Sequence, residues 1–279
     1  MEIQFVSSRQ NPLVKFVCGL ADKKKRAEYG LFRFDGIKLL GEALSSDVKI
    51  KNVIFRQSEG EDVPSIIKGA LATGRIDEEN VVAVSESVFE KLSEEKSPEG
   101  IITVAYKQDS LHCLWDGEMP SRDSRILIAE SLRDPGNLGT VLRSCYALGI
   151  DTLVISDDCA DIYNPKTLRA AMGAAFKLPT VSVSDLPSYI KLLRDGGRRV
   201  FATALKENSE DIGTLCLKAG DCFVIGNEGH GLTDAAIDAC TAPVIIPMRE
   251  GAESLNASAA AAICIWETVR ARREVYHER

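Results

Sequence analysis

The residues best suited to chemistry lie in three short segments, and the first of these is Asn137-x-Gly139-x-x-x-Arg143. Arg143 carries a permanent positive charge on a planar group that matches the geometry of a phosphate. Gly139 and Arg143 are four residues apart, so they share one face of a helix. Asn137 is a good residue to begin that helix. The segment by itself favours an arginine on a solvated helix face, and an arginine that binds an anion is the alternative.

The second segment is a glycine-rich loop with a carboxylate at its centre, Gly226-Asn-Glu-Gly-His-Gly231. Its spacing, G-x-x-G-x-G, is neither the dinucleotide-binding fingerprint nor a phosphate-binding P-loop. Glycines allow the backbone to approach a ligand closely. The carboxylate of Glu228 repels phosphate and suits a cation, an amine or a hydroxyl. The loop therefore predicts a binding site for such a group, and an ordinary surface loop is the alternative.

The third segment precedes a helix whose first turns are almost all alanine, Ala257-Ser-Ala-Ala-Ala-Ala. Pro247 and Met248 come first, and Ser254 and Asn256 lie directly before the helix. A helix cap explains one of these two polar residues. It does not explain both of them, nor the run of small side chains. We therefore expect a backbone or a ligand to pack closely against the start of this helix.

Strand-length apolar runs lead into these segments, and helical stretches separate the runs. From residue 126 onward the two alternate, which predicts an α/β domain with a parallel sheet covered on both faces. Ligands of such sheets bind at the carboxyl ends of the strands, where the three segments lie. The expected strands cover residues 126–129, 152–155, 180–183, 200–205, 222–225 and 244–247, and the expected helices cover 138–148, 166–176, 186–194 and 256–272.

Residues 1–107 predict a smaller α/β domain that is richer in positive charge at its start. Two helices are expected between residues 12 and 45 around a glycine-containing turn, and strands at 52–55, 81–84 and 101–105. The stretch 108–124 loses its periodicity and is expected to be a linker, with residues 125–279 as the second domain.

A basic cluster lies within the first domain. Residues 1–56 carry 11 Lys and Arg against 6 Asp and Glu, a balance of +5. On charge alone such a cluster fits a solvated helix end at least as well as a surface that binds phosphates. The residues expected to bind RNA are Lys23, Lys24, Lys25, Arg26 and Arg33.

The composition excludes several classes of protein. A net charge of −7 and 45% hydrophobic residues over 279 residues are typical of a globular chain. The longest apolar stretch is far short of the ~20 residues of a membrane span, and the amino terminus lacks the apolar segment of a secretory signal. We therefore expect a cytoplasmic protein without a membrane segment. The eight cysteines form no C-x-x-C pair and the three histidines are scattered, so no metal site is expected.

Taken in order, the three segments resemble the motifs of the SpoU family, also called TrmH-like, of RNA ribose 2′-O-methyltransferases in the SPOUT superfamily. The matching patterns are N-x-G-x-x-x-R, then G-N-E-G-x-G-L, then I-P-M followed by S-L-N-x-S-x-A, within residues 126–272. The first domain is similar to the substrate-binding domain of that family. The similarity rests on Asn11-Pro-Leu-Val-Lys15, the basic run, Phe34-Asp-Gly36 and Ser97-Pro-Glu-Gly100.

The resemblance implies a trefoil knot in the second domain, S-adenosylmethionine as cofactor, and a homodimer packed through the knotted domains. It implies methyl transfer to a ribose 2′-hydroxyl of structured RNA, with ribosomal RNA favoured over transfer RNA. The implied cofactor pocket is lined by Thr203, Ala204, Gly226, Ile246, Met248 and Leu255, and the implied catalytic residues are Arg143, Glu228, Ser254 and Asn256.

The chemistry of the arginine limits its role in such a reaction. A guanidinium group holds its proton too tightly to act as a base, so we expect Arg143 to bind phosphate and to stabilise negative charge on the 2′-oxygen. A dinucleotide-dependent oxidoreductase would need a glycine-rich turn after its first strand, and Arg133-Asp-Pro-Gly-Asn137 is not one. A non-catalytic RNA-binding protein of the same fold would not need Arg143 and Glu228 together. Specific binding of S-adenosylmethionine separates the methyltransferase from both alternatives.

Overall fold

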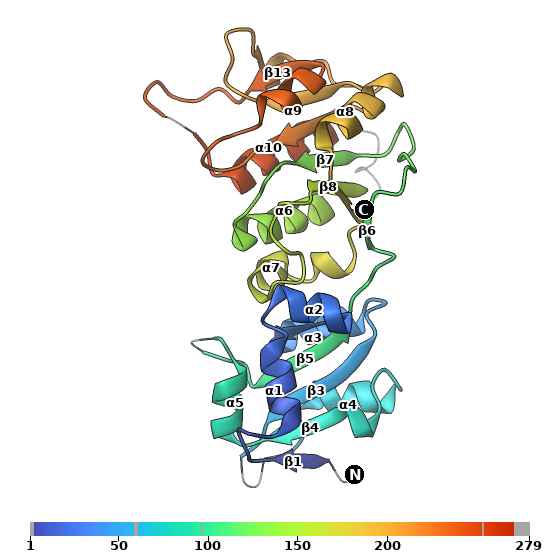
Figure 1. The fold of residues 1–279 in the computed structure, drawn as a ribbon, viewed down its shortest axis with the longest axis vertical. Coiled ribbons are helices and arrows are strands. Elements are labelled where there is room, and N and C mark those ends of the chain that lie inside the picture. Colours follow the sequence, from blue (N-terminus) through green and yellow to red (C-terminus); the bar gives the residue numbers. More distant parts are fainter. Residues whose placement is uncertain (1–2, 59–60, 96, 253, 271–279) are drawn as a thin grey trace. The chain divides into compact units, whose positions relative to one another are not determined.

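The computed structural model describes residues 3–58, 61–95, 97–252 and 254–270. The chain forms two compact units, each with its own sheet (Figure 1). The first unit consists of Met1–Gln108 and Asp161–Phe176, and the second of Asp109–Ala160 and Lys177–Arg279. None of the helices in the described ranges has both the length and the apolar character that a membrane crossing requires.

The first unit is built on a mixed sheet. Its strands are β1 (Gln4–Val6), β2 (Leu31–Asp35), β3 (Ile50–Arg56), β4 (Val81–Val84) and β5 (Ile101–Tyr106), and its helices include α1 (Pro12–Gly19), α2 (Lys23–Tyr29), α3 (Ile37–Leu44), α4 (Ser65–Ala72) and α5 (Glu86–Leu92). The order of the sheet is β1-β4-β3-β5-β2. β5 runs antiparallel to β3 and β2, whereas β1, β4 and β3 are parallel. This smaller α/β unit at the start of the chain agrees with the predicted fold class.

The region between residues 12 and 45 differs from its prediction. It holds three short helices, not two, and strand β2 separates the second from the third. Leu31, Phe32 and Phe34 are buried in this strand. Elements of five to eight residues are too short for their apolar spacing to separate a helix from a strand, so the two-helix prediction is wrong.

The segment Asp161–Phe176 belongs to the first unit by its contacts. Its helix α7 (Pro165–Ala171) ends at Met172, which has a φ of 49°, so the predicted helix 166–176 is interrupted there. The ring of Tyr163 lies 4.6 Å from that of Phe32, between centroids, and Phe176 lies 5.3 Å from Phe34. The sequence-based boundaries assign this segment to the second domain, whereas its side chains pack in the first unit.

The second unit is built on an entirely parallel sheet of eight strands, as the predicted fold class requires. The order is β11-β13-β10-β12-β7-β8-β9-β6. The strands are β6 (His112–Leu114), β7 (Ile126–Ala129), β8 (Thr152–Ser156), β9 (Thr180–Val183), β10 (Val200–Thr203), β11 (Glu210–Asp211), β12 (Cys222–Ile225) and β13 (Ala242–Ile245), and the helices are α6 (Pro135–Leu148), α8 (Leu186–Asp195), α9 (Asp234–Ala239) and α10 (Ala257–Arg270).

Two of these strands were not expected, and both lie at the edges of the sheet. β6 falls in the predicted linker and pairs with β9, and β11 pairs with β13. The central strand β7 is buried along its whole length, as expected of a strand covered on both faces. The predicted end of the last helix at residue 272 lies outside the described residues.

Candidate active site

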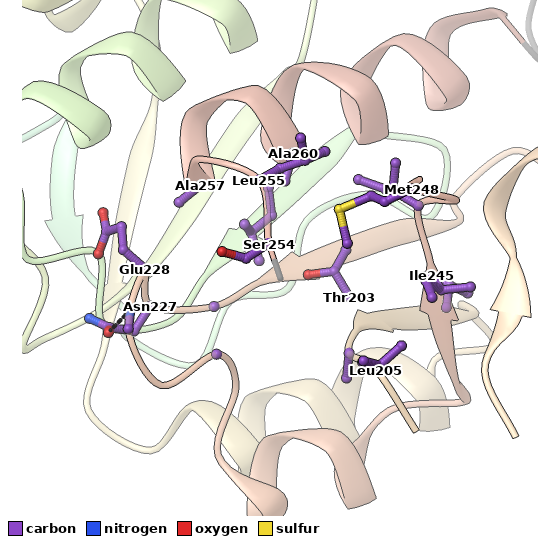
Figure 2. Close-up of a pocket in the computed structure, with 17 residues that line it drawn as sticks. Thr203, Leu205, Asn227, Glu228, Ile245, Met248, Ser254, Leu255, Ala257 and Ala260 are labelled. Carbon is purple, nitrogen blue, oxygen red and sulfur yellow. Dashed lines mark hydrogen bonds between the residues drawn. The ribbon is translucent and has the colours of Figure 1, made fainter. Parts of the chain in front are cut away.

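A pocket of about 370 Å³ lies at the carboxyl ends of three neighbouring strands, β13, β10 and β12. Thr203, Ile225 and Ile245 end these strands and line the pocket. The start of α10 adds Ala257 and Ala260 to the wall (Figure 2). The small side chains at the start of α10 therefore leave room for this pocket, in the part of a parallel sheet where ligands bind.

The wall of the pocket brings together most of the predicted site residues. It includes all six residues predicted to contact a cofactor, which are Thr203, Ala204, Gly226, Ile246, Met248 and Leu255. Glu228 and Ser254 from the predicted catalytic set line it as well. Glu228 is the one ionisable side chain among the described lining residues, and the others are apolar or uncharged. Such a wall suits a largely apolar ligand with a positive charge.

Gly226 is required by the shape of its own loop. A Cβ atom at this position would lie 2.4 Å from the carbonyl carbon of Gly231 and 2.5 Å from the backbone nitrogen of Leu232. The loop folds back on itself because Asn227 and Gly231 exchange two backbone hydrogen bonds, of 3.0 and 2.9 Å. The absence of a side chain at Gly226 thus allows the loop to close, which is a different reason from the direct ligand contact that the sequence suggests.

Asn137 connects the three predicted segments, and sequence reasoning missed this role. Its side-chain nitrogen donates to Glu228 Oε1 at 2.7 Å, and its side-chain oxygen accepts from Asn256 Nδ2 at 3.0 Å. The prediction that Asn137 caps α6 is wrong, because the cap is Asp134, whose carboxylate accepts the Asn137 backbone N–H. The signal for the missed role was the presence of Asn137 in the same segment as Arg143.

Further hydrogen bonds hold both ends of the glycine-rich loop. At its start, Asn227 Nδ2 donates to the carbonyl oxygen of Ser131 at 2.8 Å. At its end, the buried carboxylate of Glu130 accepts from the backbone N–H of Thr233 at 2.8 Å and from its hydroxyl at 2.7 Å. Glu130 and Ser131 directly follow β7, so the central strand positions the loop that carries Glu228.

Ser131 has a φ of 55°, a conformation uncommon for a residue with a side chain, and polar contacts surround it. Its hydroxyl donates to Asp158 at 2.6 Å. Burial alone would raise the pKa of Asp158, but hydrogen bonds from Ser131, Ser156 and Arg133 lower it. The carboxylate is therefore held in its charged form.

Across the described ranges, no group of three or more His, Cys, Asp or Glu side chains could hold a metal ion.

Arg143 lies apart from the pocket wall. It is exposed, past the midpoint of α6, and has no hydrogen bond or ion pair within the described part of the chain. Tyr146, three residues on, is also exposed. Asn256 caps the start of α10, where its side-chain oxygen accepts from the Ser258 N–H at 2.9 Å. The structure thus joins Glu228 and Asn256 through Asn137 and leaves Arg143 available to a ligand outside the pocket.

The predicted RNA-binding residues divide into two groups. Lys23, Lys24 and Lys25 are exposed in the first turn of α2, where Lys25 pairs with Glu28 at 2.9 Å. Arg26 and Arg33 are only 2% exposed. The first three residues remain in the proposed RNA surface.

Arg26 and Arg33 serve the interior of the first unit. Arg26 pairs with Asp161 and donates to the carbonyl oxygens of Leu20 and Ala21, and Arg33 pairs with Glu94 at 2.8 Å. A guanidinium that is buried and held in an ion pair in this way cannot reach an RNA phosphate. The prediction that these two arginines bind RNA is therefore corrected.

Both parts of the sequence match the models of known protein families. Residues 124–266 match the SpoU rRNA Methylase family, and residues 11–103 match the MRM3-like substrate binding domain. The chain is 31% identical to the 23S rRNA (guanosine(2553)-2'-O)-methyltransferase RlmP of Bacillus subtilis, over 94% of this chain and 97% of the relative. It is 26% identical to the 23S rRNA (uridine(2479)-2'-O)-methyltransferase of Streptomyces viridochromogenes, over 96% and 92%.

A solved structure gives the same assignment. The AdoMet-bound rRNA methyltransferase from Sinorhizobium meliloti is 27% identical to this chain and has a TM-score of 0.82, with 96% of this chain and 98% of that one covered. The likeness extends over both units, and it confirms the family and the fold class that the three segments predict. The chain belongs to the SpoU rRNA methylase family.

Proposed function

We propose that this protein transfers a methyl group from S-adenosylmethionine to a ribose 2′-hydroxyl of ribosomal RNA. The observation that carries the proposal is the pocket at the ends of β13, β10 and β12. Its wall combines a closed glycine loop, apolar side chains and a single carboxylate, Glu228, among the described residues. The names of the relatives support ribosomal RNA over transfer RNA, since one methylates a guanosine and the other a uridine of 23S rRNA.

The pocket residues fit the proposed cofactor. When bound, S-adenosylmethionine supplies a methyl group on a positively charged sulfur. Thr203, Ala204, Gly226, Ile246, Met248 and Leu255 would hold it. The apolar wall matches an adenosine, and the carboxylate of Glu228 is the complement of a cation.

The polar residues around the pocket would position the RNA nucleotide. Asn137 holds Glu228 through a hydrogen bond of 2.7 Å and Asn256 through one of 3.0 Å. Ser254 lines the same pocket. Arg143 would bind a phosphate and stabilise negative charge on the 2′-oxygen, because its guanidinium stays protonated and offers several donors.

A homodimer would place a second copy of the chain next to Arg143. α6 packs against α10, and each helix carries an exposed aromatic residue, Tyr146 at 47% and Trp266 at 54% exposure. Exposed aromatic residues are enriched at interfaces between proteins. A second copy that packs on these two residues would lie next to the face of α6 that carries Arg143. We also propose that the second unit contains a trefoil knot and that the protein is cytoplasmic.

Methyl transfer with labelled cofactor tests the proposal directly. The protein is incubated with methyl-labelled S-adenosylmethionine and unmodified 23S rRNA, and the RNA is then cleaved by alkali. We expect the label in dinucleotides that resist alkali, because a methylated 2′-oxygen cannot attack the adjacent phosphate. RNA binding without methyl transfer would support the non-catalytic RNA-binding protein instead, and label on a base would refute ribose as the target.

A further inference from the structure

Tyr106 lies at the end of β5 in the first unit with two lysines against its ring. Tyr106 is 36% exposed. The ammonium nitrogen of Lys49 lies 5.2 Å from the ring centroid, and that of Lys51 lies 5.6 Å from it. Neither lysine forms an ion pair with a carboxylate in the part of the chain that the structure describes. One exposed tyrosine therefore carries two positive charges that none of the described carboxylates neutralises.

A β-bulge lies at the second of these lysines. Ile50 pairs with Ala105 and Asn52 pairs with Val104, so Lys51 is an extra residue in β3. Bulges change the direction of side chains and occur often beside functional sites. Two ammonium groups on one ring also repel each other. An anion bound between them would remove that repulsion, so the geometry favours a negatively charged partner.

The partner that fits both features is a nucleic acid strand with an unpaired base. Phosphates complement the lysines, and a base stacks on an aromatic ring. A cation on an exposed aromatic ring is held weakly, so each lysine can exchange the ring for a phosphate when a strand binds.

We propose that Tyr106, Lys49 and Lys51 form an RNA-binding surface that stacks an unpaired base of the substrate. This surface uses other residues than the predicted lysines of α2, of which Lys25 already pairs with Glu28 at 2.9 Å. The inference rests on the proposed function, because it assumes that the first unit binds the RNA that is methylated.

Binding of the full-length protein to a 20-nucleotide single-stranded RNA of mixed sequence, and to a duplex of the same sequence, tests the surface. Stacking on aromatic rings contributes roughly tenfold or more to the affinity for each base. We expect Tyr106→Ala to weaken single-strand binding about tenfold and duplex binding less than about twofold, because paired bases cannot stack on the ring. Tyr106→Phe keeps the ring and should bind like the parent.

Salt dependence tests the lysines. Each phosphate contact contributes a slope of about 0.7 to the dependence of log affinity on log salt for single strands. Lys49→Ala with Lys51→Ala should therefore lower the slope by about 1.4. The matched control is Lys68→Ala, which removes an exposed charge of the same unit that pairs with Asp62 at 2.8 Å, and it should leave the slope unchanged.

Two results would overturn the inference: single-strand affinity of Tyr106→Ala within twofold of the parent, or equal losses for Tyr106→Ala and Tyr106→Phe. Failure of the proposed function is a different result, namely a parent protein that transfers no methyl group. A parent that binds neither RNA would also overturn the inference, and methyl transfer to 23S rRNA would then test the proposed function separately.

Discussion

The pocket of the second unit and the basic residues of the first unit were both indicated by short stretches of sequence, yet their residues are used in different ways. Eight predicted residues line one pocket, from Thr203 to Leu255 along the chain. Of the five predicted basic residues, three are exposed lysines on α2, whereas Arg26 and Arg33 are buried in ion pairs.

The difference follows from the kind of signal in each region. The pocket residues follow strands, and parallel strands bring their carboxyl ends to one edge of a sheet whatever their distance in sequence. A count of basic residues contains no information about which way each side chain points. Arg26 follows three exposed lysines directly in the same helix and faces the interior. Motifs tied to strand ends therefore predict positions better than charge does.

Arg143 is the strongest test of this difference, because it is a motif residue that lies outside the pocket wall. We expect Arg143→Ala to slow methyl transfer by about 10²–10³, the scale of losing one donor to a developing oxyanion. Arg143→Lys keeps the charge without the planar fork and should remain strongly impaired. Single-turnover transfer at saturating cofactor measures both, and cofactor affinity should stay unchanged. Activity of Arg143→Ala within twofold of the parent would contradict the catalytic role.

A pair of glycines in one loop tests the pocket. Gly226→Ala places a Cβ 2.4 Å from backbone, whereas at Gly229 the nearest atom, the Asn227 side-chain oxygen, is 3.6 Å away. We expect Gly226→Ala to weaken binding of S-adenosylmethionine about 100-fold, because the loop cannot close around an added methyl group. Gly229→Ala is the matched control and should bind within about threefold of the parent. Calorimetric titration measures both affinities, and equal losses would mean that loop closure is not what Gly226 provides.

The buried arginine tests the first unit. Arg26→Ala leaves the carboxylate of Asp161 without its ion pair, in a site where Asp161 is 17% exposed. We expect the free energy of unfolding of this unit to fall by about 3 kcal/mol. Both tryptophans, Trp115 and Trp266, lie in the second unit. Urea unfolding followed by circular dichroism should therefore shift while the tryptophan transition stays in place.

The exposed neighbour Lys24 is the control for that experiment. Lys24→Ala should leave the unfolding transitions unchanged, because its side chain is exposed and no carboxylate pairs with it in the described ranges. A loss of stability as large as that of Arg26→Ala would show that α2 itself, rather than the buried ion pair, sets the stability.

Of the five residues predicted to bind RNA, the three lysines of α2 are the ones that remain exposed at the surface. Reversing the charge of Lys23, Lys24 and Lys25 to Glu should weaken RNA binding at least about tenfold at ~50 mM salt and flatten its salt dependence, since fewer counterions are released. Cofactor affinity should not change. Unchanged RNA affinity would show that the RNA interface lies elsewhere on the protein, for example at the surface around Tyr106.

The smallest expected effect concerns Asn137, which the structure adds to the site. Asn137→Ala removes the hydrogen bonds to Glu228 and Asn256, each contributing about 1 kcal/mol or less at an exposed position. We expect methyl transfer to slow about fivefold with the fold intact. Thr140→Ala, which loses only a bond to the Gly136 carbonyl oxygen in the same helix, is the control. Equal rates for the two variants would remove Asn137 from the site.

Much of the fold could be read from local pattern. Most strands of the second unit are runs of four or five residues rich in apolar side chains, and the alternation with helices favours a parallel sheet. Strands β6 and β11, of three and two residues, are too short to show a period. The segment Asp161–Phe176 shows no local sign of the unit in which it packs, because its partners Phe32 and Phe34 lie more than a hundred residues earlier.

The residue types of the site and their place at strand ends follow from the amino-acid order alone, since spacing and glycine content are local properties. The connections among those residues are not local. Asn137 meets Glu228 across 91 positions and Asn256 across 119, and Arg26 meets Asp161 across 135. Only the folded chain brings such pairs within hydrogen-bond distance, because the packing of whole sheets and helices sets which distant side chains meet. The same packing decides that Arg26 is buried while Lys24, two residues before it, remains in water.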